Sequence, residues 1–143
     1  MFVTLRGQLD SLPTNMEYVV CGQAAAKLLG LTTIKPPLSI YSSVYIYPDL
    51  AIENIILENF DDIDIVKVRG GIRCTSVEQT IIDLLKKEGQ CDPQVIPECI
   101  AMLLTCDNRN DTLIANIETL VIENGLADRY SKYKENAEDF WRC

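Results

Sequence analysis

Two acidic side chains near the middle of the chain have the spacing best suited to chemistry. Asp62 and Asp64 are separated by one residue within Asp61-Asp62-Ile63-Asp64-Ile65-Val66. Because side chains alternate along a strand, a strand here would place both carboxylates on one face. Two convergent carboxylates can hold Mg²⁺ for phosphoryl transfer, as in nucleotidyltransferases. The same alternation, with Ile63 and Ile65 facing inward, is also typical of an ordinary half-exposed strand, which is the interpretation we favour.

A nucleotidyltransferase site would also need a turn of small residues shortly before the acidic pair. The candidate turn, Cys21-Gly22-Gln23, lies forty positions before Asp62 and lacks the small residue after the glycine. We therefore prefer a function without catalysis. A diverged Mg²⁺-dependent nucleotidyltransferase that uses Asp62 and Asp64 is the alternative.

Other reactive constellations have little support in the sequence. The chain has no histidine, which removes the usual general base of a nucleophilic triad. It has six cysteines but no C-x-x-C pair, so a zinc site is not indicated. Cys74 has one positive neighbour, Arg73, which is thin support for a reactive thiolate. We expect most of the thiols to be buried and to pack as small hydrophobic groups. No cofactor is expected, and free thiols favour a location in the reducing cytoplasm.

Length and charge limit the classes of function. The 143 residues, 48% of them hydrophobic, fit one domain spanning residues 1–143. The formal net charge of -8 argues against direct nucleic-acid binding, which depends on lysine and arginine at phosphates. No signal peptide or membrane span is expected. An acidic surface suits solubility or a basic protein partner.

Three tyrosines provide the best candidate for a partner-binding surface. Tyr41, Tyr45 and Tyr47 fall on one face of the strand expected over residues 38–47. Tyrosine is enriched at the centres of protein interfaces. If the aliphatic face of the strand is core, the tyrosine face is the outer one. It is then either covered by a neighbouring helix or exposed for binding.

The first half of the chain is expected to be rich in strands. Residues 16–29 resemble a helix ended by Gly30, although residues 18–20 can equally form a short strand that leads into it. Further strands are expected over residues 2–5, 38–47, 55–57 and 63–68. Gly70-Gly71 predicts a tight turn into Ile72-Arg73-Cys74.

Helices are expected to dominate the second half. Thr75 and Glu78 have the spacing of a capping box at the start of a helix. Asp92-Pro93 predicts a second helix that ends near Cys106, and a third should run from Asn110-Asp111 to Gly125. A last amphipathic segment starts at Leu126. The order predicts an α+β fold, with a small mixed sheet in the N-terminal half and helices segregated towards the C-terminus.

Two segments resemble the AbiEi antitoxin family. Val20-Cys21-Gly22-Gln23-Ala24-Ala25-Ala26-Lys27-Leu28-Leu29-Gly30-Leu31 is similar to that family's serine-glycine-x-x-alanine-leucine … glycine-leucine helix. The segment from Gly71 to Leu85 resembles its G-V-x-V-T-S-P-E-R-T-L-L-D-L signature. Val77 and Gln79 replace the proline and arginine of that signature. The resemblance covers roughly residues 18–90.

The resemblance implies a role in a bacterial type IV toxin–antitoxin or abortive-infection system. AbiEi proteins are antitoxins and transcriptional regulators whose N-terminal winged helix binds DNA, and the cognate toxin is a nucleotidyltransferase. Only 17 residues precede Tyr18, so the resemblance implies the C-terminal antitoxin-type domain without the winged helix. We therefore expect a non-enzymatic, antitoxin-like protein that acts by protein–protein binding, with self-association left open.

Overall fold

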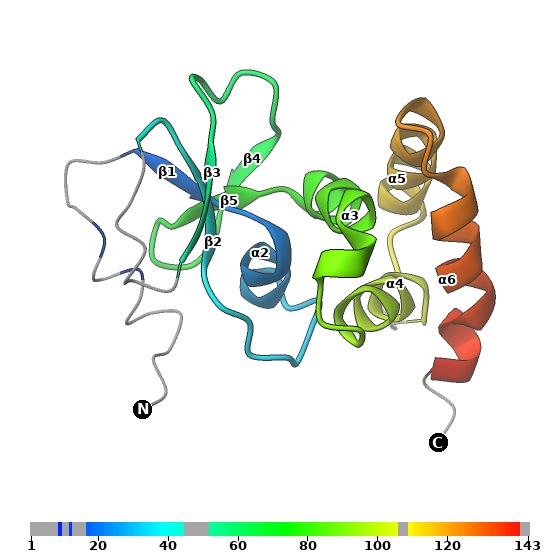
Figure 1. Cartoon of the computed structure of the whole chain (residues 1–143). Coiled ribbons are helices and arrows are strands. Elements are labelled where there is room, and N and C mark those ends of the chain that lie inside the picture. Colours follow the sequence, from blue (N-terminus) through cyan, green and yellow to red (C-terminus); the bar gives the residue numbers. More distant parts are fainter. Residues whose placement is uncertain (1–8, 10–11, 13–16, 45–51, 106–108, 141–143) are drawn as a thin grey trace.

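A computed structural model describes residues 9, 12, 17–44, 52–105 and 109–140 of the chain. Its described part is an α+β fold, as the sequence predicts, with a mixed five-stranded sheet and five α-helices. Figure 1 shows the strands gathered on one side, helices α4, α5 and α6 on the other, and α2 and α3 between them. Among the described residues, every helix is too short or too polar to be a bilayer-spanning segment.

The sheet has the strand order β3-β2-β1-β5-β4. The strands are β1 (Tyr18–Val20), β2 (Ser39–Ser42), β3 (Glu53–Ile56), β4 (Ile65–Lys67) and β5 (Arg73–Thr75). β1 runs parallel to β5 and antiparallel to β2, while β3 is parallel to β2. β3 and β4 are therefore the two edge strands, and the chain between them passes from one edge of the sheet to the other.

The hairpin predicted at the double glycine is confirmed. β4 and β5 are antiparallel, with Val66 opposite Cys74. Gly70 and Gly71 have φ angles of 86° and 77°, a left-handed conformation that strains any residue with a Cβ atom. This glycine pair therefore allows the chain to reverse within a few residues.

The strand expected over residues 38–47 is shorter within the described part. β2 ends at Ser42, and a bend follows at Ser43 and Val44. The Ser42 hydroxyl donates to the Val44 carbonyl at 2.5 Å, which stabilises the bend in place of a continued strand. Residues 45–51 lie outside the described residues, as does the strand expected over residues 2–5.

Helix α2 (Gly22–Leu28) follows β1 directly, so the second of the two alternatives for this segment is correct. Three successive alanines, Ala24, Ala25 and Ala26, are fully buried. Ala24 and Ala25 pack in a hydrophobic cluster with the sheet, while Ala26 belongs to the cluster of the C-terminal helices. Small side chains let this short helix lie close to neighbours on both sides.

The cap of helix α3 (Val77–Lys86) lies one residue later than the capping box predicts. Thr75 belongs to β5, and its hydroxyl bonds with that of Thr80 at 2.7 Å. Ser76 is the N-cap instead, since its hydroxyl accepts from the Gln79 amide at 3.1 Å. The prediction failed because strand pairing with β4 holds Thr75 in extended backbone.

The remaining helices form the C-terminal side. They are a 3₁₀ turn (Glu88–Gln90), α4 (Val95–Thr105), α5 (Asp111–Glu123) and α6 (Ala127–Phe140). Asn110 caps α5 by accepting from the Leu113 amide at 3.0 Å, and Gly125, with a φ of 69°, follows its end, as predicted. Ile117, Val121 and Tyr130 are buried in the same cluster as residues of α3 and α4.

Candidate functional site

A small polar cavity lies where β2 and β3 face helix α3. Ser39 pairs with Glu53 and Tyr41 pairs with Ile55 across the two parallel strands. Because side chains alternate along a strand, these four lie on one face of the sheet and buried Ile40 lies on the other. All four line the cavity, and the opposite wall comes from α3 and the start of α2, with Asp83, Leu84, Lys87, Cys21, Gly22 and Gln23.

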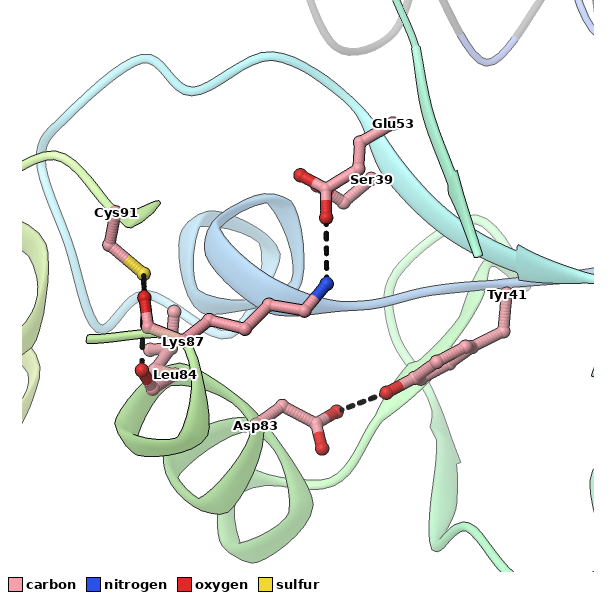
Figure 2. A network of polar contacts seen from close by, with 7 residues as sticks. All are labelled: Ser39, Tyr41, Glu53, Asp83, Leu84, Lys87 and Cys91. Atoms are coloured by element: carbon pink, nitrogen blue, oxygen red, sulfur yellow. Dashed lines mark hydrogen bonds and ion pairs between the residues drawn. The ribbon is translucent and has the colours of Figure 1, made fainter. Parts of the chain in front are cut away.

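Asp83 is the centre of the hydrogen-bond network in this cavity. The Tyr41 hydroxyl donates to Asp83 Oδ2 at 3.0 Å (Figure 2), and Gln79 Nε2 donates to Asp83 Oδ1 at 3.0 Å. Gln79 Oε1 also accepts from the Asp64 amide at 3.3 Å. The network therefore ties α3 to β2 and to the residue that precedes β4.

A second contact lies at the outer side of the cavity. Lys87 Nζ lies 2.8 Å from Glu53 Oε1, and the Ser39 hydroxyl is 3.5 Å from Glu53 Oε2 (Figure 2). Both charged side chains are 40–50% exposed, so solvent screens their attraction. Asp83 and Lys87 are four residues apart, one turn along the chain, which places them on the same side of α3.

The electrostatics of the cavity favour neutral forms. Burial raises the pKa of Asp83, and the hydrogen bonds from Gln79 and Tyr41 and the charges of Lys86 and Lys87 only partly offset it. Burial, with the nearby charge of Asp83, also raises the pKa of Tyr41 and of the Cys21 thiol well above their usual ranges. Cys21 and Tyr41 therefore stay protonated at neutral pH and are poor nucleophiles.

The free space within this cavity is about 30 Å³. A polar cavity of this size can hold a water molecule. The charged and hydroxyl groups around it already bond to one another. The arrangement can therefore hold a water and fix α3 on the sheet, and it has no room for a nucleotide.

The structure does not place the acidic pair on a strand, so that expectation is wrong. Asp62 lies in a turn, and β4 begins only at Ile65, after Asp64. Both side chains are exposed. The turn forms because Asn59 Oδ1 accepts from the Asp61 amide at 3.1 Å and bends the chain before the strand starts. Within the described residues, no group of three or more potential metal-binding side chains comes together.

Of the three tyrosines, the structure describes only Tyr41. It is half-buried, and its hydroxyl points to Asp83 of α3 (Figure 2). A neighbouring helix therefore covers this part of the tyrosine face, one of the two alternatives left open by the sequence. Tyr45 and Tyr47 lie outside the described residues.

The cysteines in the described part are free thiols. Cys21, Cys74 and Cys99 are buried, as expected for small hydrophobic groups, and Cys91 is half-buried. Burial raises the pKa of Cys74 despite its neighbour Arg73, so the structure gives no support to a reactive thiolate there. Cys106 and Cys143 lie outside the described residues.

The segment from Gly71 to Leu85, which resembles the AbiEi signature, has its polar residues where α3 packs on the sheet. Ser76 caps α3, Thr75 and Thr80 bond to each other, and Asp83 bonds to Tyr41. Sequence reasoning missed this site because Tyr41 and Asp83 are 42 residues apart. The signal that could have found it is an acidic side chain on the inner side of a helix, surrounded by buried Ile82, Leu84 and Leu85.

Comparisons with protein-family models and with curated proteins found no match to this chain. The resemblance to AbiEi proteins accordingly rests on the residues quoted above.

Proposed function

We propose that this chain is a non-enzymatic, antitoxin-like regulatory protein of the cytoplasm that acts by binding another protein. The observation that carries the proposal is the small size of the polar cavity and the pairing of the charged groups that line it. Its charged groups pair with one another around about 30 Å³ of free space, so a partner would meet the outer surface instead. The four described free thiols, three of them buried, fit a reducing compartment.

The resemblance to AbiEi proteins suggests the identity of the partner. On that basis the partner is a nucleotidyltransferase-type toxin encoded beside this chain. The polar residues that carry the resemblance fix α3 on the sheet, so they support a shared scaffold more directly than a shared contact surface. The partner therefore remains the part of the proposal that needs a direct experiment.

The experiment is co-expression of the full chain with the protein encoded by the neighbouring gene. We expect growth arrest by the neighbour to be relieved, and the two purified proteins to elute as one complex. The double variant Asp62→Ala, Asp64→Ala is the matched control, and it should protect as well as the wild type. Arrest that persists with a soluble, folded chain would contradict the proposal.

Calorimetry with Mg²⁺ and a nucleoside triphosphate tests the enzymatic alternative directly. We expect no heat of binding, because Asp62 and Asp64 are both exposed and the polar cavity has only about 30 Å³ of free space. Heat that the wild type gives and the Asp64→Ala variant lacks would favour a nucleotidyltransferase over an antitoxin.

A further inference from the structure

The outer edge of β4 is open in the described part of the structure. β4 ends the strand order, so β5 is its one neighbour among the described strands. An unpaired strand edge exposes a row of amide and carbonyl groups, and proteins usually cover it or blunt it. β4 is short and carries Lys67, which blunts the edge, but its backbone is still available for pairing.

The hydrogen-bond pattern shows which backbone groups point outward. The Val68 amide donates to the Ile72 carbonyl, and the Ser76 amide donates to the Asp64 carbonyl, both at 2.9 Å. In an antiparallel pair, residues that bond inward alternate with residues that bond outward. The amide and carbonyl groups of Ile65 and Lys67 therefore point away from β5.

A row of apolar side chains crosses the sheet and stops at this edge. The register aligns Ile40, Val20, Cys74 and Val66 on neighbouring strands. The first three are fully buried, whereas Val66, the last of the row, is 37% exposed. The sheet thus ends in an apolar side chain that a further strand would cover.

The charges along β4 are complementary to the same strand run in the opposite direction. Asp62 and Asp64 precede the strand, while Lys67 and Arg69 lie at its far end, and all four are exposed. An antiparallel copy of β4 would bring its basic end beside the acidic end of the first. With Val66 opposite its own copy, Asp64 lies opposite Val68 and Lys67 opposite Ile65, so these charges attract between the ends of the two strands and not as directly opposed side chains.

From these features we infer that a second copy of this chain pairs with it, edge to edge and antiparallel, through β4. The two-fold axis passes between the two Val66 residues, and Ile65 of each copy exchanges hydrogen bonds with Lys67 of the other. The arrangement joins two five-stranded sheets into one and continues the apolar row across the axis. Such a contact is isologous, so it closes at the dimer.

The first test compares two substitutions at one position by sedimentation equilibrium of the full chain. Lys67→Pro removes the outward-pointing amide, and proline is tolerated where an edge strand faces solvent. Lys67→Ala is the matched control, because it keeps that amide. We expect the wild type and Lys67→Ala to dimerise. In Lys67→Pro the dimer dissociation constant should rise at least about tenfold, because symmetry removes two hydrogen bonds at once.

A second variant keeps the test decisive if Lys67→Pro does not fold. Val66→Lys places two like charges on the two-fold axis and should also give monomers, with a circular dichroism spectrum like that of the wild type. A wild-type chain that stays monomeric at every concentration reached would overturn the inference. So would a dimer that both variants leave unchanged.

Discussion

Two carboxylates in different regions of the molecule have the same local arrangement and opposite electrostatics. Asp83 of α3 faces the sheet, and Glu98 of α4 faces the loop that follows α2. Each accepts a hydrogen bond from the glutamine four residues earlier, Gln79 at 3.0 Å and Gln94 at 2.9 Å. The pKa of Asp83 is raised and that of Glu98 is lowered.

The difference comes from the number and kind of the other donors. Burial alone would raise the pKa of Glu98, but hydrogen bonds from Gln94, the Thr33 amide and the hydroxyls of Thr32 and Thr33 outweigh it. Among the described residues, Tyr41 is the one other hydrogen-bond donor to Asp83, and the charges of Lys86 and Lys87 have a smaller effect. Hydrogen bonds to the charged form favour ionisation, and desolvation opposes it.

The comparison shows that the pKa of a carboxylate on a packed helix depends on how many donors reach it. Glu98 is 2% exposed and holds the chain after α2 against α4 through hydrogen bonds from Thr33 and Gln94. Asp83 lines a cavity, and its hydrogen bonds only partly offset its desolvation. Replacing each carboxylate by its amide should therefore change stability in opposite directions.

The largest effect is expected for Glu98→Gln. The amide nitrogen must face donors that now meet a carboxylate oxygen, so at least one buried donor loses its acceptor. We expect a loss of about 2 kcal/mol in the free energy of unfolding at pH 7, measured by urea titration. Gln94→Ala is a control that removes one donor and should cost less. An unchanged midpoint in Glu98→Gln would contradict this account of Glu98.

The next prediction compares serine substitutions at two buried cysteines, Cys99 of α4 and Cys21 at the start of α2. Cys99 lies beside Glu98 in the apolar cluster, and burial raises its pKa to about 12. Cys99→Ser should cost about 2 kcal/mol, because its hydroxyl would replace an apolar contact. Cys21 is the N-cap of α2 but makes no cap hydrogen bond. Cys21→Ser can supply one, so it should lose less than about 0.5 kcal/mol or gain stability. Equal losses in urea titrations would contradict the difference between the two sites.

A smaller effect of opposite sign is expected for Asp83→Asn. Asparagine keeps an acceptor for Gln79, and the Tyr41 hydroxyl can rotate to accept from the new amide. The variant removes a poorly solvated charge, so we expect a gain of up to about 1 kcal/mol at pH 7. Tyr41→Phe is the matched variant at the other end of this hydrogen bond, and it should lose stability. A clear loss in Asp83→Asn would show that the charge itself holds α3.

The pH dependence of stability in Asp83→Asn and Glu98→Gln tests whether each charge stabilises or destabilises the fold. The raised pKa of Asp83 means that the folded chain binds this proton more tightly than the unfolded chain. Its unfavourable contribution at neutral pH is therefore relieved as the pH falls through the raised pKa, and the gain from Asp83→Asn should shrink there. The lowered pKa of Glu98 has the reverse effect, since its contribution is lost as the pH falls through that pKa. Thermal melts of both variants from pH 7 to pH 3 measure this.

The smallest effect is expected for Lys87→Ala. Its ion pair with Glu53 is half exposed, and such pairs contribute about 0–1 kcal/mol. We expect a change below about 0.5 kcal/mol that vanishes in 1 M salt, measured by the same titration. A larger, salt-independent loss would indicate that packing of the lysine stem closes the cavity.

Local patterns in the sequence predict much of the fold. Gly70-Gly71 and the apolar residues around it predict the hairpin, and Asn110 and Gly125 predict the limits of α5. The cap at Thr75 failed because Thr75 pairs with Ile65 as part of this hairpin, so the strand extends one residue further and the helix begins after Ser76. The strand expected to carry Asp62 and Asp64 begins later for a different reason, since a turn that starts at Asn59 includes Asp62 although the residues alternate like a strand.

Patterns within single segments of the sequence could not predict the candidate site. The sequence places Tyr41 on the outer face of its strand, either covered or exposed, but its partner Asp83 comes from a helix 42 residues later. Glu53 and Lys87 come together only when β3 lies parallel to β2 and α3 packs across them. Spacing within one element identifies faces, and only the topology identifies which faces meet.

The three alanines of α2 also bear on how the molecule unfolds. Ala24 and Ala25 contact one hydrophobic cluster and Ala26 the other, so the helix is shared by both halves. Neither half can lose its order without exposing a surface on which the other depends. Heating or denaturant should therefore give one concerted transition, in which the strands and the C-terminal helices disappear together.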